Sequence, residues 1–203
     1  MDKKKIVRKG YNKIAKKYLE SILKNLEEMS FLQEFISLIN EKGKVLDVGC
    51  GAGLPYTKYL SDYFEVIGID ISEVQIDRAK KNVPKAQFYV KDMTKLDFSE
   101  NTFVGILASY SIIHVPREEH YDLFVNFHRM LKSNGIALIT LHSTGDPRSI
   151  EEDFFEAKMF WSGYDTETNL RMLIETGFEI IWSKHVDSSL GYIKHLFVLI
   201  RKP

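Results

Sequence analysis

Three aspartates mark the ends of three short apolar runs in the first half of the chain. Asp47 lies near the end of the first run, Asp70 ends the second, and Asp92 lies two residues beyond the third. Short apolar runs of this kind are typical of strands buried on both faces of a parallel sheet. In an open α/β sheet the ligand crevice lies beyond the carboxyl ends of the strands, so the three carboxylates are expected to meet at one edge. A carboxylate at the position of Asp70 can accept hydrogen bonds from both hydroxyls of a ribose.

Glycines at alternate positions interrupt the chain directly after the first apolar run. Because they lack a Cβ atom, Gly49, Gly51 and Gly53 can adopt unusual dihedral angles and let a ligand approach the backbone closely. A strand, a glycine turn and a helix that can begin at Pro55 together form a nucleotide-binding corner. A dinucleotide fingerprint has the spacing G-x-G-x-x-G, whereas this loop has G-x-G-x-G preceded by Asp47. A carboxylate there would repel a pyrophosphate, so the loop favours a ligand with a cationic or amino-bearing group.

The segment 47–53, with the pattern D-x-G-x-G-x-G, resembles the first motif of class I S-adenosylmethionine (SAM)-dependent methyltransferases of the small-molecule type. The resemblance covers nearly the whole chain, because later motifs follow in the expected order at 66–72, 89–93 and 103–116. It implies an α/β fold: a doubly wound, mostly parallel seven-stranded sheet with a C-terminal antiparallel hairpin and helices on both faces. It also implies SAM as the cofactor, with S-adenosylhomocysteine (SAH) as the product.

The resemblance assigns cofactor contacts to individual residues. Asp92 matches the acidic position that accepts a hydrogen bond from the adenine amino group, and Met93 could lie against the purine face. Tyr11 and Tyr18 share a helix face and resemble the tyrosines of an N-terminal lid over the cofactor; packing against the core is the alternative. The complete implied set is Asp47, Gly49, Cys50, Gly51, Asp70, Ile71, Asp92, Met93, Ser109, Tyr11 and Tyr18.

The segment 109–116 lies where this family faces the methionine end of the cofactor and the methyl acceptor. A sulfonium is already a reactive methyl donor, so catalysis mainly requires positioning and exclusion of water. A base is required only when the acceptor must lose a proton. The candidate catalytic residues are His114 and His142, at the ends of the fourth and fifth predicted strands, together with Tyr110; a structural role for each histidine is the alternative.

Strands alternate with helices along the chain, which favours a doubly wound parallel sheet. Strands are predicted at 45–48, 64–70, 86–90, 103–109, 136–141, 178–184 and 195–200, and helices at 11–28, 31–39, 55–62, 72–83, 117–131 and 165–176. The helices within 1–41 are expected to form the lid. The aromatic-rich stretch 143–164 has no clean periodicity and is expected to lie near the acceptor.

Composition indicates one globular domain spanning 1–203, with 44% hydrophobic and 28% charged residues. Lysines and arginines equal aspartates and glutamates at 28 each, so no net field attracts nucleic acid or a membrane. No apolar run has the length of a membrane span and no signal-peptide core follows the N-terminus, so a cytoplasmic location is expected. The basic cluster that includes Lys4 is predicted to be a solvated helix face. With Cys50 as the single cysteine, no multi-cysteine zinc site is possible, and no metal is expected.

A small-molecule acceptor is favoured over nucleic acid. The chain lacks the Asn/Asp-Pro-Pro-aromatic motif typical of enzymes that methylate base amines, and its only cysteine lies in the cofactor loop. A monomer and a homodimer fit the sequence equally well. Two rival functions stay open: a SAM- or SAH-binding module without catalysis, and a dinucleotide-dependent oxidoreductase, which the glycine spacing disfavours.

Overall fold

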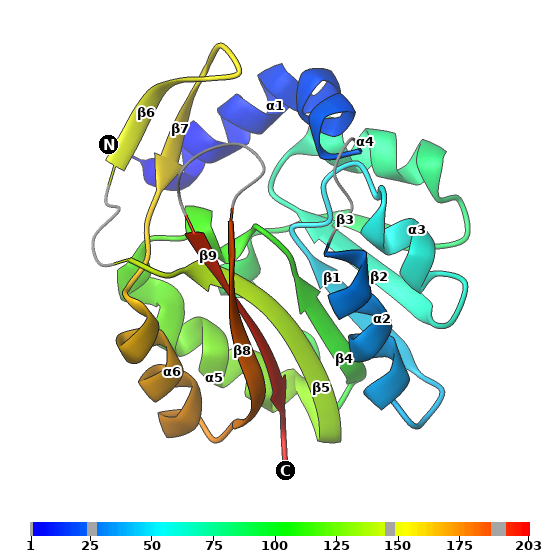
Figure 1. The fold of residues 1–203 in the computed structure, drawn as a ribbon. Helices are drawn as coiled ribbons and strands as arrows, with labels where there is room; N and C mark the ends of the chain where they lie inside the picture. The colour runs from blue at the N-terminus through cyan, green and yellow to red at the C-terminus, as the bar shows by residue number, and fades with distance from the viewer. Residues whose placement is uncertain (1, 24–27, 145–148, 188–193) are drawn as a thin grey trace.

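A computed structural model of the chain describes residues 2–23, 28–144, 149–187 and 194–203 (Figure 1). Its main element is a seven-stranded sheet with the strand order β3-β2-β1-β4-β5-β9-β8. The strands are β1 (Lys44–Val48), β2 (Glu65–Asp70), β3 (Gln87–Val90), β4 (Phe103–Ala108), β5 (Leu131–His142), β8 (Glu179–Asp187) and β9 (Lys194–Arg201). The first five pair in parallel, and β9 pairs antiparallel with both β5 and β8. The predicted sheet and its C-terminal hairpin are confirmed.

Helices cover both faces of this sheet. They are α1 (Lys3–Ile22), α2 (Met29–Leu38), α3 (Tyr56–Leu60), α4 (Glu73–Asn82), α5 (His120–Met130) and α6 (Thr166–Glu175). Alternation along β1 explains the two layers: Leu46 and Val48 pack in the cluster that holds α5 and α6, whereas Val45 packs in the cluster that holds α2 and α3. None of these described helices is both long enough and apolar enough to cross a bilayer.

The helix starts predicted from capping residues are confirmed at two positions. The Ser72 hydroxyl caps α4 by accepting a hydrogen bond from the Gln75 N–H at 3.1 Å. Asp165 caps α6 by accepting from the Thr168 N–H at 2.8 Å. At the other end of α6, Gly177 has a φ of 96° and stops the helix.

The sheet order places the predicted motifs side by side. Because β3, β2, β1 and β4 are successive neighbours and run in parallel, their carboxyl ends share one edge. The residues after these strands therefore follow one another along that edge: Asp92, then Asp70, then the glycine loop, then the segment 109–114. The last three residues of that segment form a 3₁₀ turn, η2 (Ile112–His114).

The N-terminal helix α1 is longer than the sequence predicted. It begins at Lys3 rather than at residue 11, with Asp2 as its N-cap. Ile6 and Val7 are already buried in its first turns, but a run of lysines around them hides this apolar face in the sequence. The helix lies across the carboxyl edge of the sheet, beside a second, two-stranded sheet (Figure 1).

That second sheet lies in the stretch 143–164, for which the sequence predicted no secondary structure. Here the chain forms the antiparallel hairpin β6 (Ser149–Phe154) and β7 (Ala157–Trp161), and residues 145–148 of the stretch lie outside the described ranges. Its turn residues Phe155 and Glu156 have φ values of 53° and 71°. Asn-Gly or Asp-Gly is the usual signal for such a turn, so the sequence Phe-Glu does not predict a hairpin.

Candidate cofactor and acceptor site

One cavity at the carboxyl edge of the sheet brings most of the predicted site residues together. About 700 Å³ of space, part of it open to solvent, lies between its walls. The predicted residues that line it are Tyr11, Tyr18, Gly49, Gly51, Asp70, Ile71, Asp92, Met93, Ser109, Tyr110 and His114. Asp47, Cys50 and His142 are not among the lining residues.

The glycine corner forms one wall of the cavity. The backbone N–H groups of Gly49 and Cys50 both donate to the Ile69 carbonyl, at 2.8 and 2.9 Å, which ties the loop to the end of β2. Gly49 has a φ of 77°, and a Cβ atom there would overlap the side chain of Ser111. At Gly51, by contrast, no atom of the described chain lies within 4 Å of the Cβ position. Gly49 is thus required by the fold, while Gly51 leaves the backbone open to the cavity.

Asp70 is held in place by the loop that it follows. Its Oδ2 accepts from the Gly51 N–H at 2.9 Å, and its Oδ1 accepts from the Ser72 N–H at 2.8 Å. Burial raises the pKa of Asp70 to about 6, although the hydrogen bonds from Ser72 and Gly51 act in the opposite direction. Above this pKa the carboxylate is ionised, and each oxygen keeps a lone pair for hydroxyl groups in the cavity.

Asp92 is also ionised and already well bonded. Its carboxylate accepts from the Thr94 N–H at 3.0 Å, the Thr94 hydroxyl at 2.9 Å and the Lys4 ammonium at 3.1 Å. Partial burial acts to raise the pKa of Asp92, but the hydrogen bonds from Thr94 and Lys4 outweigh it and hold that pKa below its usual value. The methionine that follows, Met93, lines the same part of the cavity.

Asp47 does not face the cavity, contrary to the prediction. Residues alternate in direction along β1, so Asp47 points to the same side as Val45 and lies under α3. Only 3% of Asp47 is exposed, and its Oδ2 accepts from the Thr57 hydroxyl at 2.5 Å. Burial raises the pKa of Asp47 to about 7, against the opposing effect of the Thr57 hydrogen bond. Cys50 is likewise buried, among α4 residues.

Tyr11 and His114 meet across the cavity from distant parts of the chain. The Tyr11 hydroxyl lies 2.8 Å from His114 Nε2, and His114 Nδ1 lies 2.8 Å from the Phe160 carbonyl. Because a carbonyl can only accept, Nδ1 carries the proton and Nε2 accepts from Tyr11. Burial lowers the pKa of His114 to about 4, so the ring is neutral at physiological pH. Trp161 packs on its other side, with ring centroids 4.4 Å apart.

Tyr110 lines the cavity next to this pair, in a strained conformation. Its φ is 51°, a value that residues other than glycine seldom adopt outside constrained sites. Its hydroxyl donates to Glu28 Oε1 at 2.5 Å, and the Tyr56 hydroxyl donates to the other oxygen at 3.3 Å. The ring also packs edge-on against His195, with centroids 5.0 Å apart.

His142, the third catalytic candidate, lies behind the cavity. It is 2% exposed, and neither ring nitrogen has a hydrogen-bond partner within the described ranges. Its ring lies 5.8 Å from that of His195, its partner across the β5–β9 pair. Burial lowers the pKa of His142 to about 3. Across the described residues, no group of three or more His, Cys, Asp or Glu side chains is placed to hold a metal ion.

Comparison with known proteins agrees with this geometry. A family model described as a methyltransferase domain matches residues 45–135. An uncharacterized methyltransferase of Synechocystis, sll0829, is 30% identical over 149 residues, which cover 70% of this chain and 69% of the relative. This chain belongs to the methyltransferase family.

Longer methyltransferases and solved structures also match. Phosphoethanolamine N-methyltransferase 3 of Arabidopsis thaliana is 30% identical over 84% of this chain, but the chain spans only 36% of that relative. A TehB-like SAM-dependent methyltransferase from Corynebacterium glutamicum is 25% identical, with a TM-score of 0.62 over 85% of this chain and 87% of that one. A phosphoethanolamine N-methyltransferase 2 from Haemonchus contortus, in complex with phosphomonomethylethanolamine and SAH, shares the fold with a TM-score of 0.67 and 18% identity, over 86% of this chain and 52% of that one.

The polar residues that line the cavity include several outside the predicted set, among them Lys4 and Gln75. Lys4 lines the cavity instead of lying on a solvated helix face. Gln75, in the first turn of α4, is 2% exposed and lines the cavity, and its Oε1 has no hydrogen-bond partner among the described residues. Because Ile71 precedes the N-cap Ser72, no helical spacing in the sequence links Gln75 to the predicted site.

Proposed function

We propose that this methyltransferase moves a methyl group from SAM to a small amine. The observation that supports the proposal most is the order of polar groups along one cavity. Asp92 and Asp70 follow neighbouring strands, the open backbone of Gly51 comes next, and His114 with its Tyr11 partner lies beyond β4. A ligand with a nucleoside at one end and a reactive group at the other fits this order.

The residues of the nucleoside end suit an adenosine. Asp70 keeps lone pairs for the two ribose hydroxyls while its oxygens are held by two backbone N–H groups. Asp92 is an ionised acceptor for an adenine amino group, and Met93 and Ile71 offer apolar surface for the purine. When bound, SAM supplies a sulfonium that is already activated for methyl transfer.

At the acceptor end, Tyr11 and His114 are proposed to carry the proton that an amine must lose. Burial raises the pKa of Tyr11 well above 10, so its hydroxyl is protonated and donates to His114 Nε2. As the amine gives a proton to the Tyr11 oxygen, the Tyr11 proton can pass to His114 Nε2, and the amine nitrogen gains the lone pair that attacks the methyl. Tyr110 is proposed to position the acceptor, and His142 has no part in this step.

An amine acceptor is supported by the Arabidopsis relative, whose name specifies N-methylation of phosphoethanolamine. The equal numbers of basic and acidic residues fit a small molecule better than a nucleic acid. The same proposal includes the finer points taken from the sequence: a cytoplasmic enzyme that is a monomer or a homodimer, with a lid from the helices within 1–41. Of these helices α1 lines the cavity and is the proposed lid, whereas α2 packs on the main sheet.

The proposal is tested by turnover and by binding. We expect the purified protein to convert SAM to SAH in the presence of a panel of small amines that includes phosphoethanolamine. Replacing Asp70 with alanine should weaken SAM and SAH binding by about 1–3 kcal/mol in calorimetry, since hydrogen bonds to a charged group are lost. Asp62→Ala, at an exposed ion pair with Lys85, is the control and should bind normally. Binding without turnover on any acceptor would indicate a SAM- or SAH-binding module, and absence of binding would refute the proposal.

A further inference from the structure

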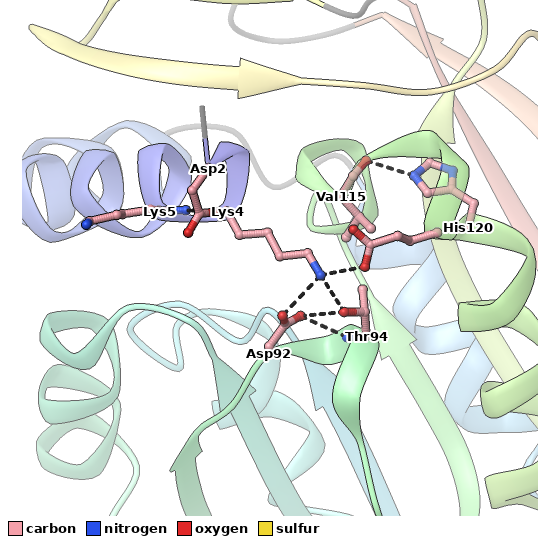
Figure 2. A network of polar contacts seen from close by, with 8 residues as sticks. Asp2, Lys4, Lys5, Asp92, Thr94, Val115 and His120 are labelled. Carbon is pink, nitrogen blue, oxygen red and sulfur yellow. Dashed lines mark hydrogen bonds and ion pairs between the residues drawn. The ribbon is translucent and has the colours of Figure 1, made fainter.

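Lys4 links three segments of the chain that are far apart in sequence. Its ammonium lies 3.1 Å from Asp92 Oδ2 and 2.5 Å from both Thr94 Oγ1 and Glu119 Oε2. Thr94 belongs to the 3₁₀ turn η1 (Met93–Lys95) after β3, and Glu119 belongs to η3 (Arg117–Glu119) before α5. Figure 2 shows the Lys4 side chain running from α1 down to Asp92 and Thr94, whereas Lys5 extends along the helix away from them.

The Lys4–Asp92 pair is better shielded from water than the Lys4–Glu119 pair or the surface pair Arg8–Glu73. The side chains of Lys4 and Asp92 are 20% and 22% exposed, whereas Glu119 is 39% exposed and Arg8 and Glu73 are 51% and 44% exposed. Exposed pairs contribute little to stability, while partly desolvated and geometrically fixed pairs are screened less by salt. Burial acts to lower the pKa of Lys4, but the hydrogen bonds to Glu119 and Asp92 outweigh it, so the ammonium stays charged.

Lys4 lies at the nucleoside end of the cavity. Lys4, Asp92 and Met93 all line it, and Val7 lines it from the next turn of α1. The Asp92 carboxylate therefore accepts a hydrogen bond from the Lys4 ammonium and can accept another from a ligand in the cavity. Because Thr94 and Lys4 already fix both of its oxygens, Asp92 is oriented before a ligand arrives.

We propose that Lys4 is a positioning residue for the nucleoside: by bridging Asp92 and Glu119 it holds the first turns of α1 over the nucleoside end and sets how long the cofactor stays bound. The proposal rests on the proposed function, since it takes SAM and SAH as the ligands. Without the ammonium, two carboxylates that share it would face each other without a counter-charge. The first turns of α1 would lose this tether to the edge of the sheet, and Asp92 would keep only its hydrogen bonds from Thr94.

Binding kinetics of the intact chain test this role. The ligands are SAH and 5′-methylthioadenosine, which has the nucleoside but lacks the amino-acid end. We expect Lys4→Met to raise the dissociation rate and the Kd about tenfold for both ligands, because the affected contact is at the nucleoside they share. Lys4→Arg should restore both values to within about threefold, since a guanidinium can still bridge two carboxylates. Lys5→Met, on the same turn but with an exposed side chain, should change neither value by more than about twofold.

A Glu119 variant tests whether Lys4 acts by positioning α1 or only by touching the ligand. Glu119 pairs with Lys4 but does not line the cavity. Glu119→Gln should raise the Kd for SAH about threefold, and the double variant with Lys4→Met should be no weaker than Lys4→Met alone. Hydrogen exchange of the ligand-free protein should be faster over residues 3–10 in Lys4→Met, and unchanged in Lys5→Met.

Failure of the Lys4 role and failure of SAM and SAH binding give different results. If the unmodified protein binds SAH while Lys4→Met keeps the same Kd, dissociation rate and exchange rates, the role of Lys4 is refuted and the proposed function stands. A loss in Lys4→Met that neither Lys4→Arg restores nor Glu119→Gln reproduces would also refute the bridge. If the unmodified protein binds neither SAH nor 5′-methylthioadenosine, the proposed function fails and this inference fails with it.

Discussion

The proposed nucleoside half of the cavity, formed by Gly49, Gly51, Asp70 and Asp92, is built largely from neighbours in sequence. Asp70 accepts from Ser72, two residues away, and Asp92 accepts from Thr94, also two residues away. The acceptor half is built from distant segments. The partners Tyr11 and His114 are 103 residues apart, and His114 and Phe160 are 46 apart.

The two halves therefore differ in their sensitivity to a shift of α1 or of the β6–β7 hairpin. Short loops hold the nucleoside half, so its geometry depends on local turns and on the end of β2. The acceptor half depends on how α1 and the β6–β7 hairpin pack against each other, because Ile6, Ile14, Met159 and Phe160 form one cluster. Changes in that packing should alter turnover before they alter the sheet. Lys4 is the contact through which α1 also reaches the nucleoside half.

The largest effect is expected where the local turn is most constrained. Gly49→Ala should destabilise the protein by about 3–5 kcal/mol, because it adds a left-handed penalty to an overlap with Ser111. Gly51→Ala is the matched control, since Gly51 also has a positive φ but open space around it. Gly51→Ala should destabilise the protein by only about 1 kcal/mol. Equal free energies of unfolding in urea for the two variants would contradict the account of the glycine corner.

In the acceptor half, His114→Asn should lower kcat about 100-fold while the Kd for SAM changes less than threefold, the pattern expected when a proton acceptor is removed. Tyr11→Phe should lower kcat in the same way, because it breaks the hydrogen bond to Nε2. His128→Asn, on the outer helix α5, serves as the control and should keep full activity. Parallel losses in kcat and SAM affinity would make His114 structural.

The buried Asp47 should make the free energy of unfolding depend on pH. Its pKa rises from 3.8 in the unfolded chain to about 7 in the folded one, so the folded state holds a proton more tightly. Its contribution is present in full below pH 4 and is lost as the pH rises to about 7. Asp47→Asn should therefore gain about 3 kcal/mol relative to the unmodified protein between pH 4.5 and pH 8 in denaturant titrations. A difference that stays constant with pH would rule out the raised pKa.

The smallest effect is expected at the contact between α1 and the hairpin. A Cβ atom at Gly10 would lie 2.8 Å from the Lys158 carbonyl oxygen and 2.8 Å from Met159 Cε. Alanine favours a helix over glycine by about 1 kcal/mol, which offsets much of the clash. Gly10→Ala should thus change the free energy of unfolding by about 1 kcal/mol or less, yet lower kcat about fivefold by moving Tyr11. Unchanged kcat would show that Tyr11 does not depend on this packing.

Much of the fold could be predicted because its signals are local. Apolar runs, the glycine spacing and the caps at Ser72 and Asp165 each act within a few residues, and the structure agrees with them. The hairpin of β6 and β7 could not be predicted, because Phe155 and Glu156 are unusual turn residues. Asp47 was assigned to the ligand from its motif, although the alternation along β1 turns it under α3.

The sequence by itself determined the strands of the main sheet, the glycine corner and the carboxylate that ends β2, because those features depend on residues close together in the chain. Tertiary structure alone decided that Tyr11 meets His114, that Lys4 reaches Asp92 across 88 residues, and that His142 lies behind the cavity. The physical reason is that these contacts depend on how α1 and the hairpin pack on the edge of the sheet. No spacing along the chain records that packing.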